Sequence, residues 1–231
     1  AGAYAAHRPG YPDEAIDAVL EGLGDPRTLI VADVGAGTGI SSRALAERGV
    51  GVIAIEPNAS MRANAAGDPR VAWHEGTGEA TGLGDNDVDI AATFQAFHWF
   101  ATPAGIAELR RIARKRAALV QYERDETDPF GRDYGDIVRR FATDDTEALR
   151  MRALETFAAF PDARVTRAAF PSSQSLDLDG LLGRAASSSY LPTDGAEADA
   201  MRVELRALFE RYARGDRIAF TMTTYVLRAD W

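Results

Sequence analysis

The chain has 231 residues, 46% hydrophobic and 26% charged, and its 35 acidic and 26 basic side chains give a formal net charge of −9. This composition is typical of a globular protein with a sizeable core and excludes wholesale disorder, while the acidic balance argues against binding to nucleic acid. Cysteine is absent, which excludes disulfides, and no apolar run reaches the roughly 18 residues of a membrane helix. We therefore expect a soluble, cytoplasmic protein without a membrane partner.

Helix and strand signals alternate along the first half of the chain. The expected helices cover 12–20, 40–48, 59–66 and 103–114, and the expected strands cover 28–34, 51–55, 70–74, 87–94 and 117–121. Short buried strands that alternate with helices are typical of a parallel sheet covered on both faces. The sequence therefore predicts an α/β fold with a doubly wound, mostly parallel sheet.

The alternation stops after Tyr122. Two helical stretches, 134–141 and 145–160, follow without a strand signal between them, and we interpret 123–162 as a helical insertion or cap. A strand over 165–170, helices over 177–188 and 195–214, and a β-rich run over 217–227 complete a predicted sheet of seven strands. We expect a single domain over 1–231, with 1–12 as an N-terminal lid segment.

The most informative stretch is the glycine loop, residues 35–39. The first predicted strand leads into Gly35-Ala36-Gly37-Thr38-Gly39, and a helix follows at once. Glycines allow a tight backbone turn and let a ligand approach without meeting a Cβ atom. Ile40 stands where a dinucleotide-binding fingerprint requires its third glycine, which argues against a nicotinamide cofactor.

Two acidic residues flank the glycine loop. Asp33 precedes the loop, and Glu56 ends the second predicted strand. Because ligands of a parallel sheet bind beyond the carboxyl ends of its strands, we expect both carboxylates to face one crevice. Asp33 suits a cationic or zwitterionic ligand, and Glu56 can accept hydrogen bonds from both hydroxyls of a ribose. Either acid alone is compatible with a helix cap or a solvated strand end, but their joint spacing around the loop favours binding.

On these residues the sequence resembles the class I S-adenosylmethionine (SAM)-dependent methyltransferases. Asp33-x-Gly35-x-Gly37-Thr38-Gly39 is similar to their first motif, Glu56-Pro57 to the acidic end of their second strand, and residues 75–80 with 87–89 to their third cofactor segment. Segments 4–12, 95–100 and 189–192 resemble a small-molecule subgroup related to trans-aconitate methyltransferase, so the resemblance spans essentially the whole chain. It implies a Rossmann-like fold and in-line methyl transfer from SAM to a small organic acceptor, with O-methylation of a carboxylate favoured on the resemblance alone.

The resemblance also implies a set of cofactor-binding residues. The glycine-loop backbone and Asp33 would contact the methionine moiety, Glu56 the ribose, Pro57 and Met61 the adenine face, Thr77, Gly78 and Glu79 the adenine edge, and Gln95 the sulfonium. Tyr4 and Arg8 of the lid segment would line the same site, with Arg8 pairing with the methionine carboxylate; the alternative for this segment is a flexible tail. Two departures from the family pattern are Thr77, where many relatives have Asp, and the missing Pro-Gly-Gly turn at 112–117.

The candidate acceptor residues are mostly aromatic. They are Tyr11, Phe97, Trp99 and Tyr190, with His98 as the candidate catalytic base; the alternative is that His98 and its neighbours are core residues. The insertion and the 187–190 turn are candidates for acceptor selection, and Arg132, Arg139 or Arg140 could meet an acidic acceptor unless they lie on solvated helix faces. The dispersed histidines predict no metal site.

Two other functions stay open at this point. One is an NAD(P)-dependent oxidoreductase, which Ile40 and Asp33 disfavour. The other is a non-catalytic module that binds SAM through the same fold. Stabilisation by NADH and not by S-adenosylhomocysteine would favour the oxidoreductase over a methyltransferase. Cofactor binding without turnover would favour the non-catalytic module.

Overall fold

The computed structural model describes residues 10–65 and 67–231. Within these residues, seven strands form one sheet in the order β3-β2-β1-β4-β5-β7-β6. The strands are β1 (Ile30–Val34), β2 (Gly51–Ile55), β3 (Val71–His74), β4 (Val88–Phe94), β5 (Ala113–Arg124), β6 (Arg164–Leu176) and β7 (Ile218–Asp230). The first five are parallel, and β7 is antiparallel to both β5 and β6. The predicted doubly wound, mostly parallel sheet is confirmed.

Helices cover both faces of the parallel part of the sheet. α2 (Asp13–Leu20) and α3 (Ile40–Glu47) cover one face, and α5 (Pro103–Ile112) and α7 (Thr146–Ala158) cover the other. The other described helices are α4 (Ala59–Ala63), α6 (Pro129–Phe141), α8 (Leu178–Ala186) and α9 (Gly195–Tyr212), with short 3-10 turns η1 (Pro26–Thr28) and η2 (Phe97–Trp99). Because side chains alternate along a strand, Val31 packs with α2 and α3, whereas Ala32 and Val34 pack with α5 and α7. No helix in the described ranges is long and apolar enough to cross a membrane.

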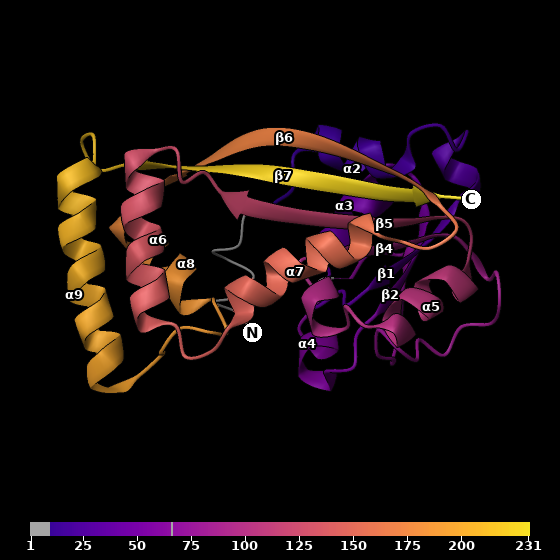
Figure 1. Cartoon of the computed structure of the whole chain (residues 1–231), viewed down its shortest axis with the longest axis horizontal. Helices are drawn as coiled ribbons and strands as arrows, with labels where there is room; N and C mark the ends of the chain where they lie inside the picture. Colours follow the sequence, from indigo (N-terminus) through magenta and orange to yellow (C-terminus); the bar gives the residue numbers. More distant parts are fainter. Residues whose placement is uncertain (1–9, 66) are drawn as a thin grey trace.

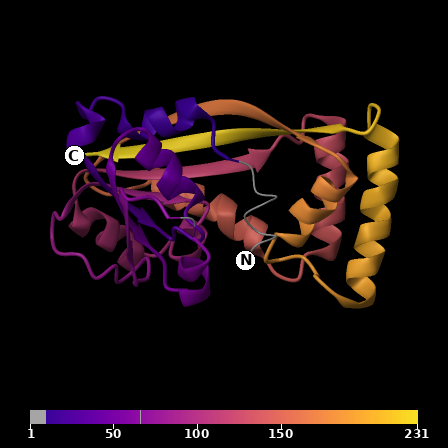
Figure 2. The same cartoon turned by 180° about the vertical axis from the view of Figure 1, so that it is seen from behind.

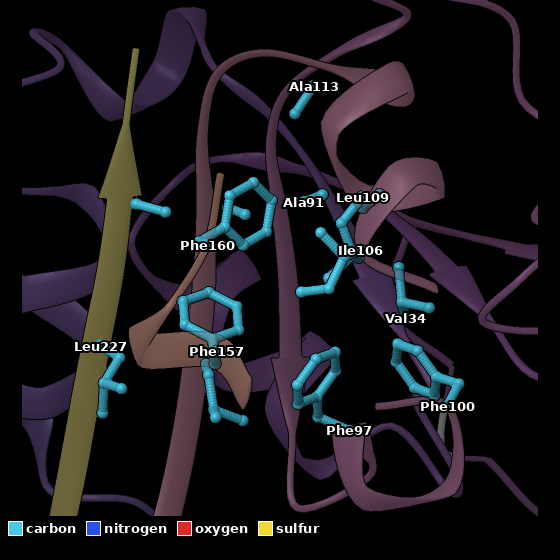
Figure 3. Close-up of a cluster of buried hydrophobic side chains, with 14 of the residues drawn as sticks. Val34, Ala91, Phe97, Phe100, Ile106, Leu109, Ala113, Phe157, Phe160 and Leu227 are labelled. Carbon is cyan, nitrogen blue, oxygen red and sulfur yellow. The ribbon is translucent and has the colours of Figure 1, made fainter. Parts of the chain in front are cut away.

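An aromatic cluster fixes α7 and η2 against the sheet (Figure 3). The ring of Phe97 lies edge-on to those of Phe100 and Phe157, with centroid distances of 5.3 and 5.5 Å. Phe157 and Phe97 are fully buried, and a pair of this geometry contributes roughly 0.5–1.5 kcal/mol beyond the area that it buries. The segment that follows β4 and the helix α7 are therefore held together as one packed unit.

A second core lies in the cap, which we define as α6, α8 and α9 with the ends of β6 and β7 that they cover. Figures 1 and 2 show these helices at one end of the molecule and the parallel strands at the other, with the long strands β5, β6 and β7 running between them. Leu176, Ile218, Phe220 and Met222 of β6 and β7 pack against the three helices. The extended strands thus carry the cap beyond the carboxyl ends of the parallel strands.

Several element boundaries differ from the prediction. β5 begins at Ala113, directly after α5, so no turn occupies 112–117. The charged residues Arg114 and Lys115 give this stretch no strand pattern in the sequence, and they pair with Asp89 on β4 at 3.3 and 3.0 Å. β6 and β7 run to 176 and 230, further than predicted. α6 begins at Pro129 rather than 134, because the Asp128 side chain caps it by accepting the Gly131 N–H at 3.0 Å.

Candidate functional site

The glycine loop bends across the carboxyl end of β2. Gly35, Gly37 and Gly39 have φ values of +79°, +58° and +77°, a region that side-chain-bearing residues rarely adopt. The N–H groups of Gly35 and Ala36 both donate to the Ile55 carbonyl, at 2.9 and 3.0 Å. A Cβ atom at Gly35 would overlap the Ala96 side chain. The loop therefore reaches from the end of β2 to the segment after β4, next to the point between β1 and β4 where the strand order reverses and α/β proteins bind their ligands.

Glu56 connects the glycine loop to α4. Its side chain is only 7% exposed, and its Oε2 and Oε1 accept hydrogen bonds from the N–H groups of Gly37 and Asn58, both at 2.9 Å. The Arg62 guanidinium donates to the Glu56 carbonyl at 2.6 Å and fixes the same turn. A carboxylate oxygen has more than one lone pair, so both oxygens keep accepting capacity towards the cavity that Glu56 lines.

Two cavities border the glycine loop, and a third adjoins them at Gln95. The central cavity, of about 290 Å³, is lined by Gly35, Gly37, Glu56, Pro57, Met61, Thr77, Gly78, Glu79, Phe94, Gln95, Ala96, Trp99 and Phe100. The loop cavity, of about 50 Å³, is lined by Tyr11, Gly35, Ala36, Gly37, Thr38, Ile40, Ser41, Phe94, Gln95 and Tyr122. The inner cavity, of about 150 Å³, is lined by Met61, Gln95, His98, Trp99, Thr146, Arg150, Ser189 and Tyr190. Gln95 lines all three.

Gln95 has a backbone conformation that is unusual for its residue type. Its φ is +60°, and its N–H donates to the Val120 carbonyl at 3.0 Å. Its side-chain Oε1 accepts a hydrogen bond from Arg150 Nη2 at 3.1 Å, whereas the buried Nε2 has no hydrogen-bonding partner within 10–65 and 67–231. A left-handed residue other than glycine costs of order 1–3 kcal/mol, and such residues cluster at functional sites. This left-handed conformation directs the Gln95 side chain to the place where the loop, central and inner cavities adjoin.

Asp33 lies beneath the glycine loop and lines none of the three cavities, contrary to the expectation that it faces the crevice. Its side chain is fully buried, and Oδ2 accepts hydrogen bonds from the hydroxyls of Ser42 and Ser41 at 2.6 and 2.7 Å. Oδ1 has no partner among the described residues. Burial raises the pKa of Asp33 to about 6; the two serine hydroxyls oppose this shift, and the Glu56 charge adds to it.

The other predicted cofactor residues gather around the loop. Those that line the central cavity are Gly35, Gly37, Glu56, Pro57, Met61, Thr77, Gly78, Glu79 and Gln95, and Ala36 and Thr38 line the loop cavity. Gly39 instead caps α3, and a Cβ atom there would lie 2.9 Å from the Trp73 ring. A Cβ atom at Gly78 would overlap the Phe100 ring, so only glycine leaves this wall of the cavity open. Tyr4 and Arg8 lie outside the described residues.

The predicted acceptor residues divide between the cavities and the core. His98, Trp99 and Tyr190 line the inner cavity; Trp99 is 60% exposed, and its ring centroid lies 4.7 Å from that of His98. Tyr11 lines the loop cavity instead, with its ring 5.0 Å from that of Phe94. Phe97 is fully buried in the aromatic cluster and lines none of the three cavities, so its predicted acceptor contact is wrong.

The arginines expected to meet an acidic acceptor lie elsewhere. Arg139 pairs with Glu126 at 2.7 Å and Arg140 with Glu204 at 2.6 Å, both on the outside of the cap, and Arg132 donates weakly to backbone carbonyls of 126 and 127. Two larger hollows, of about 320 and 450 Å³, lie in the cap and share no lining residue with the cavities at the loop. The cation that does reach the inner cavity is Arg150 of α7, which sequence reasoning missed.

Comparisons with known proteins agree with this geometry. A methyltransferase-domain model matches residues 32–120. An uncharacterized methyltransferase of Mycobacterium tuberculosis is 33% identical over 236 residues, which cover 99% of this chain and 92% of that protein. The chain belongs to the class I SAM-dependent methyltransferases. This membership decides against the NAD(P)-dependent alternative.

Solved structures of methyltransferases share the fold. A protein described as a type II methyltransferase, from Anaeromyxobacter dehalogenans, has 25% identity and a TM-score of 0.67, with 96% of this chain and 97% of that chain covered. A protein described as a methyltransferase from an antibiotic biosynthesis pathway of Anabaena variabilis has 23% identity and a TM-score of 0.65, with coverage of 91% and 96%. The predicted Rossmann-like methyltransferase fold is confirmed.

SAM, the cofactor of this family, fits the residues at the loop. The open glycine backbone leaves room for a ligand at the carboxyl end of the sheet, and Glu56 offers acceptors to hydroxyl groups. The buried Gln95 Nε2 is a donor without a partner in the described part of the chain. These same residues contain no group of three His, Cys, Asp or Glu placed to hold a metal ion.

Proposed function

We propose that this methyltransferase transfers the methyl group of SAM to a small organic acceptor bound in the inner cavity, and that the favoured acceptor atom is a carboxylate oxygen. The observation that carries the proposal is the position of Gln95, at which the loop, central and inner cavities meet. A methionine moiety in the loop cavity and an adenosine in the central cavity would present the sulfonium beside Gln95, facing the inner cavity.

The proposed cofactor contacts follow from the lining of the two cofactor cavities. Glu56 accepts hydrogen bonds from the ribose hydroxyls with the lone pairs that Gly37 and Asn58 leave available. Pro57 and Met61 pack on the adenine, and residues 77–79 contact its edge. Asp33 supports the loop from below through Ser41 and Ser42 and stabilises the positive end of the methionine moiety electrostatically rather than by lining the cavity.

The inner cavity supplies alignment. In the transfer, the carbon–sulfur bond breaks with its electron pair going to sulfur while an acceptor oxygen forms the new bond to carbon. A carboxylate acceptor loses its negative charge in this step and releases no proton, so it needs no general base. Holding such a nucleophile in line can lower the barrier by roughly 7–11 kcal/mol. An acceptor with a neutral hydroxyl or amine would need a base, and His98 is the histidine that lines the cavity.

Thermal unfolding with added ligands and a turnover screen test the proposal. S-adenosylhomocysteine should raise the unfolding temperature, whereas NADH should not. The screen measures release of S-adenosylhomocysteine from SAM with small carboxylic acids and with the matched amides, amines and phenols, and alkali should release methanol from a methyl ester product.

Three results would contradict the proposal. Stabilisation by NADH alone would refute the assignment of the cofactor. Tight S-adenosylhomocysteine binding without turnover across the whole screen would indicate a non-catalytic SAM-binding module. Turnover restricted to amines or phenols would refute the carboxylate acceptor while leaving methyl transfer intact.

A further inference from the structure

The inner cavity contains buried polar atoms whose hydrogen-bonding capacity is unused. Gln95 Nε2, Thr146 Oγ1 and Arg150 Nε are all buried and have no hydrogen-bonding partner in residues 10–65 and 67–231. All three residues line this one cavity of about 150 Å³, and Thr146 is only 2% exposed. A buried polar group without a partner costs about 1–3 kcal/mol, so a cluster of three indicates that a ligand completes the set.

Arg150 is held firmly on one side of its guanidinium. Nη2 donates to the Tyr122 carbonyl at 2.5 Å, to Glu123 Oε1 at 3.0 Å and to Gln95 Oε1 at 3.1 Å. The side chain is 12% exposed. These contacts fix the guanidinium through Nη2 and leave the Nε–H available to donate to a ligand. Because the group is already in place, binding an anion costs little further side-chain entropy.

The charge of the cavity favours an anion. Arg150 is the cation among the described lining residues, and no aspartate or glutamate is among them. Glu123 offsets part of the charge from outside the lining, and it also accepts a hydrogen bond from Gln121 Nε2 at 2.6 Å. A ligand carboxylate that accepts a hydrogen bond from Arg150 Nε would therefore meet a cation and no acidic side chain in the described lining of the cavity.

Thr146 and Arg150 lie one turn apart on α7, so they share a face of the helix. Thr146 is the first residue of α7, and its N–H donates to Asp144 Oδ1 at 2.8 Å, which fixes the start of the helix. Further along α7, the Phe157 ring packs on Phe97 of η2, the turn that also contains His98 and Trp99. The polar pair on α7 and the pair of rings on η2 are therefore held in place by packing between these two elements.

We propose that Arg150, with Thr146, binds the anionic group of the methyl acceptor, and that the acceptors of this enzyme are small molecules with a carboxylate. This inference rests on the proposed function, because it names the substrate class of the same site. The direct contact between Arg150 and Gln95 places the bound carboxylate next to the junction where the sulfonium is proposed to lie. Arg150 of α7 is thereby the specificity-determining residue of the inner cavity.

Calorimetric titration of the protein saturated with S-adenosylhomocysteine tests the inference without requiring turnover. The probes are benzoate against benzamide and malonate against malonamide, which differ in charge but little in shape. The variants are Arg150→Gln, Arg150→Lys and Thr146→Val. The matched control is Arg152→Gln, the same change at an exposed position two residues further along α7.

We expect at least one carboxylate to bind the wild-type protein more tightly than its amide. Arg150→Gln should weaken that binding about 10- to 100-fold, the range expected for losing hydrogen bonds to a charged group, and Arg152→Gln should leave it unchanged. Arg150→Lys should show an intermediate loss, because lysine keeps the charge but not the planar fork, and Thr146→Val a smaller one. Each variant is first titrated with S-adenosylhomocysteine, so that a change in cofactor affinity is separated from a change in carboxylate binding, and Arg152→Gln should bind S-adenosylhomocysteine as tightly as wild type.

Equal binding of acids and amides, no carboxylate binding by the wild type, or equal affinities in Arg150→Gln and Arg152→Gln would overturn the inference. If Arg150→Gln fails to fold, Arg150→Lys and Thr146→Val decide the same question. Failure of S-adenosylhomocysteine to bind the wild-type protein is a different result, because it refutes the proposed cofactor site and not the role of Arg150.

Discussion

Replacing Asp33 by asparagine should stabilise the cofactor-free protein at neutral and alkaline pH and change little in acid. Asp33 is fully buried, and its Oδ1 has no partner in the described part of the chain. The folded protein therefore keeps this carboxyl protonated to a higher pH than the unfolded chain does. Asparagine keeps an oxygen to accept from Ser41 and Ser42, and it introduces no charge to desolvate.

The magnitude follows from the two pKa values. The pKa of Asp33 rises from 3.8 to about 6 on folding, and each pKa unit corresponds to about 1.36 kcal/mol. Between these two values the folded state holds a proton on Asp33 that the unfolded state has lost, so the contribution of Asp33 to the free energy of unfolding falls as pH rises. Above about pH 6 the full difference, about 3 kcal/mol, is the expected advantage of Asp33→Asn, and below about pH 4 it disappears.

Urea unfolding at a series of pH values from about 4 to about 8 measures this difference directly. Subtracting the wild-type curve removes every other titrating group, because both proteins share them. Asp179→Asn, at an exposed aspartate of α8, is the matched control and should differ from wild type by less than about 0.5 kcal/mol at all pH values. A pH-independent difference for Asp33→Asn, or a loss of stability at high pH, would refute the conclusion that this carboxyl is buried with an unpaired oxygen.

Three further substitutions separate the parts of the structure. His98→Ala should lower turnover about tenfold or more through lost acceptor contacts while leaving S-adenosylhomocysteine affinity unchanged in calorimetry; a matching loss of affinity would contradict its place in the inner cavity. Gly78→Ala should weaken S-adenosylhomocysteine binding about tenfold, because the new Cβ would overlap the Phe100 ring and so change the wall of the central cavity. An unchanged Kd would show that the ring moves aside at no cost to binding. Phe220→Ala should cost about 3–5 kcal/mol in urea unfolding through the void left in the cap core, whereas exposed Val203→Ala should cost less than about 1; equal effects would mean that the cap core contributes little.

The parts of the site that lie at strand ends could be predicted from the sequence. The glycine loop and Glu56 follow buried strands directly, and the geometry of a parallel sheet brings such positions together. Asp33 shows the limit of this reasoning. Its distance from the loop places it at the strand end but does not show that Ser41 and Ser42 bind its carboxylate beneath the loop.

The residues that depend on packing between distant elements could not be predicted. In the aromatic run after β4, the 3-10 turn η2 places Phe97 and Phe100, three residues apart, on the buried side and leaves Trp99 exposed. The sequence alone does not show that this run forms a 3-10 turn, and so it does not show which of its aromatic residues are buried. Arg150 is spaced like any arginine on a solvated helix face, and only the docking of α7 on η2 brings it to Gln95.

The most direct test of the account is the affinity of S-adenosylhomocysteine for Glu56→Ala, measured by calorimetry beside wild type and the exposed control Glu47→Ala. Glu56 lines the central cavity and anchors the glycine loop. Its loss should therefore weaken binding by about 1.5–3 kcal/mol, the scale of hydrogen bonds to a charged group. Glu47→Ala should bind as tightly as wild type. Equal affinities in all three proteins would contradict the assignment of this crevice as the SAM site.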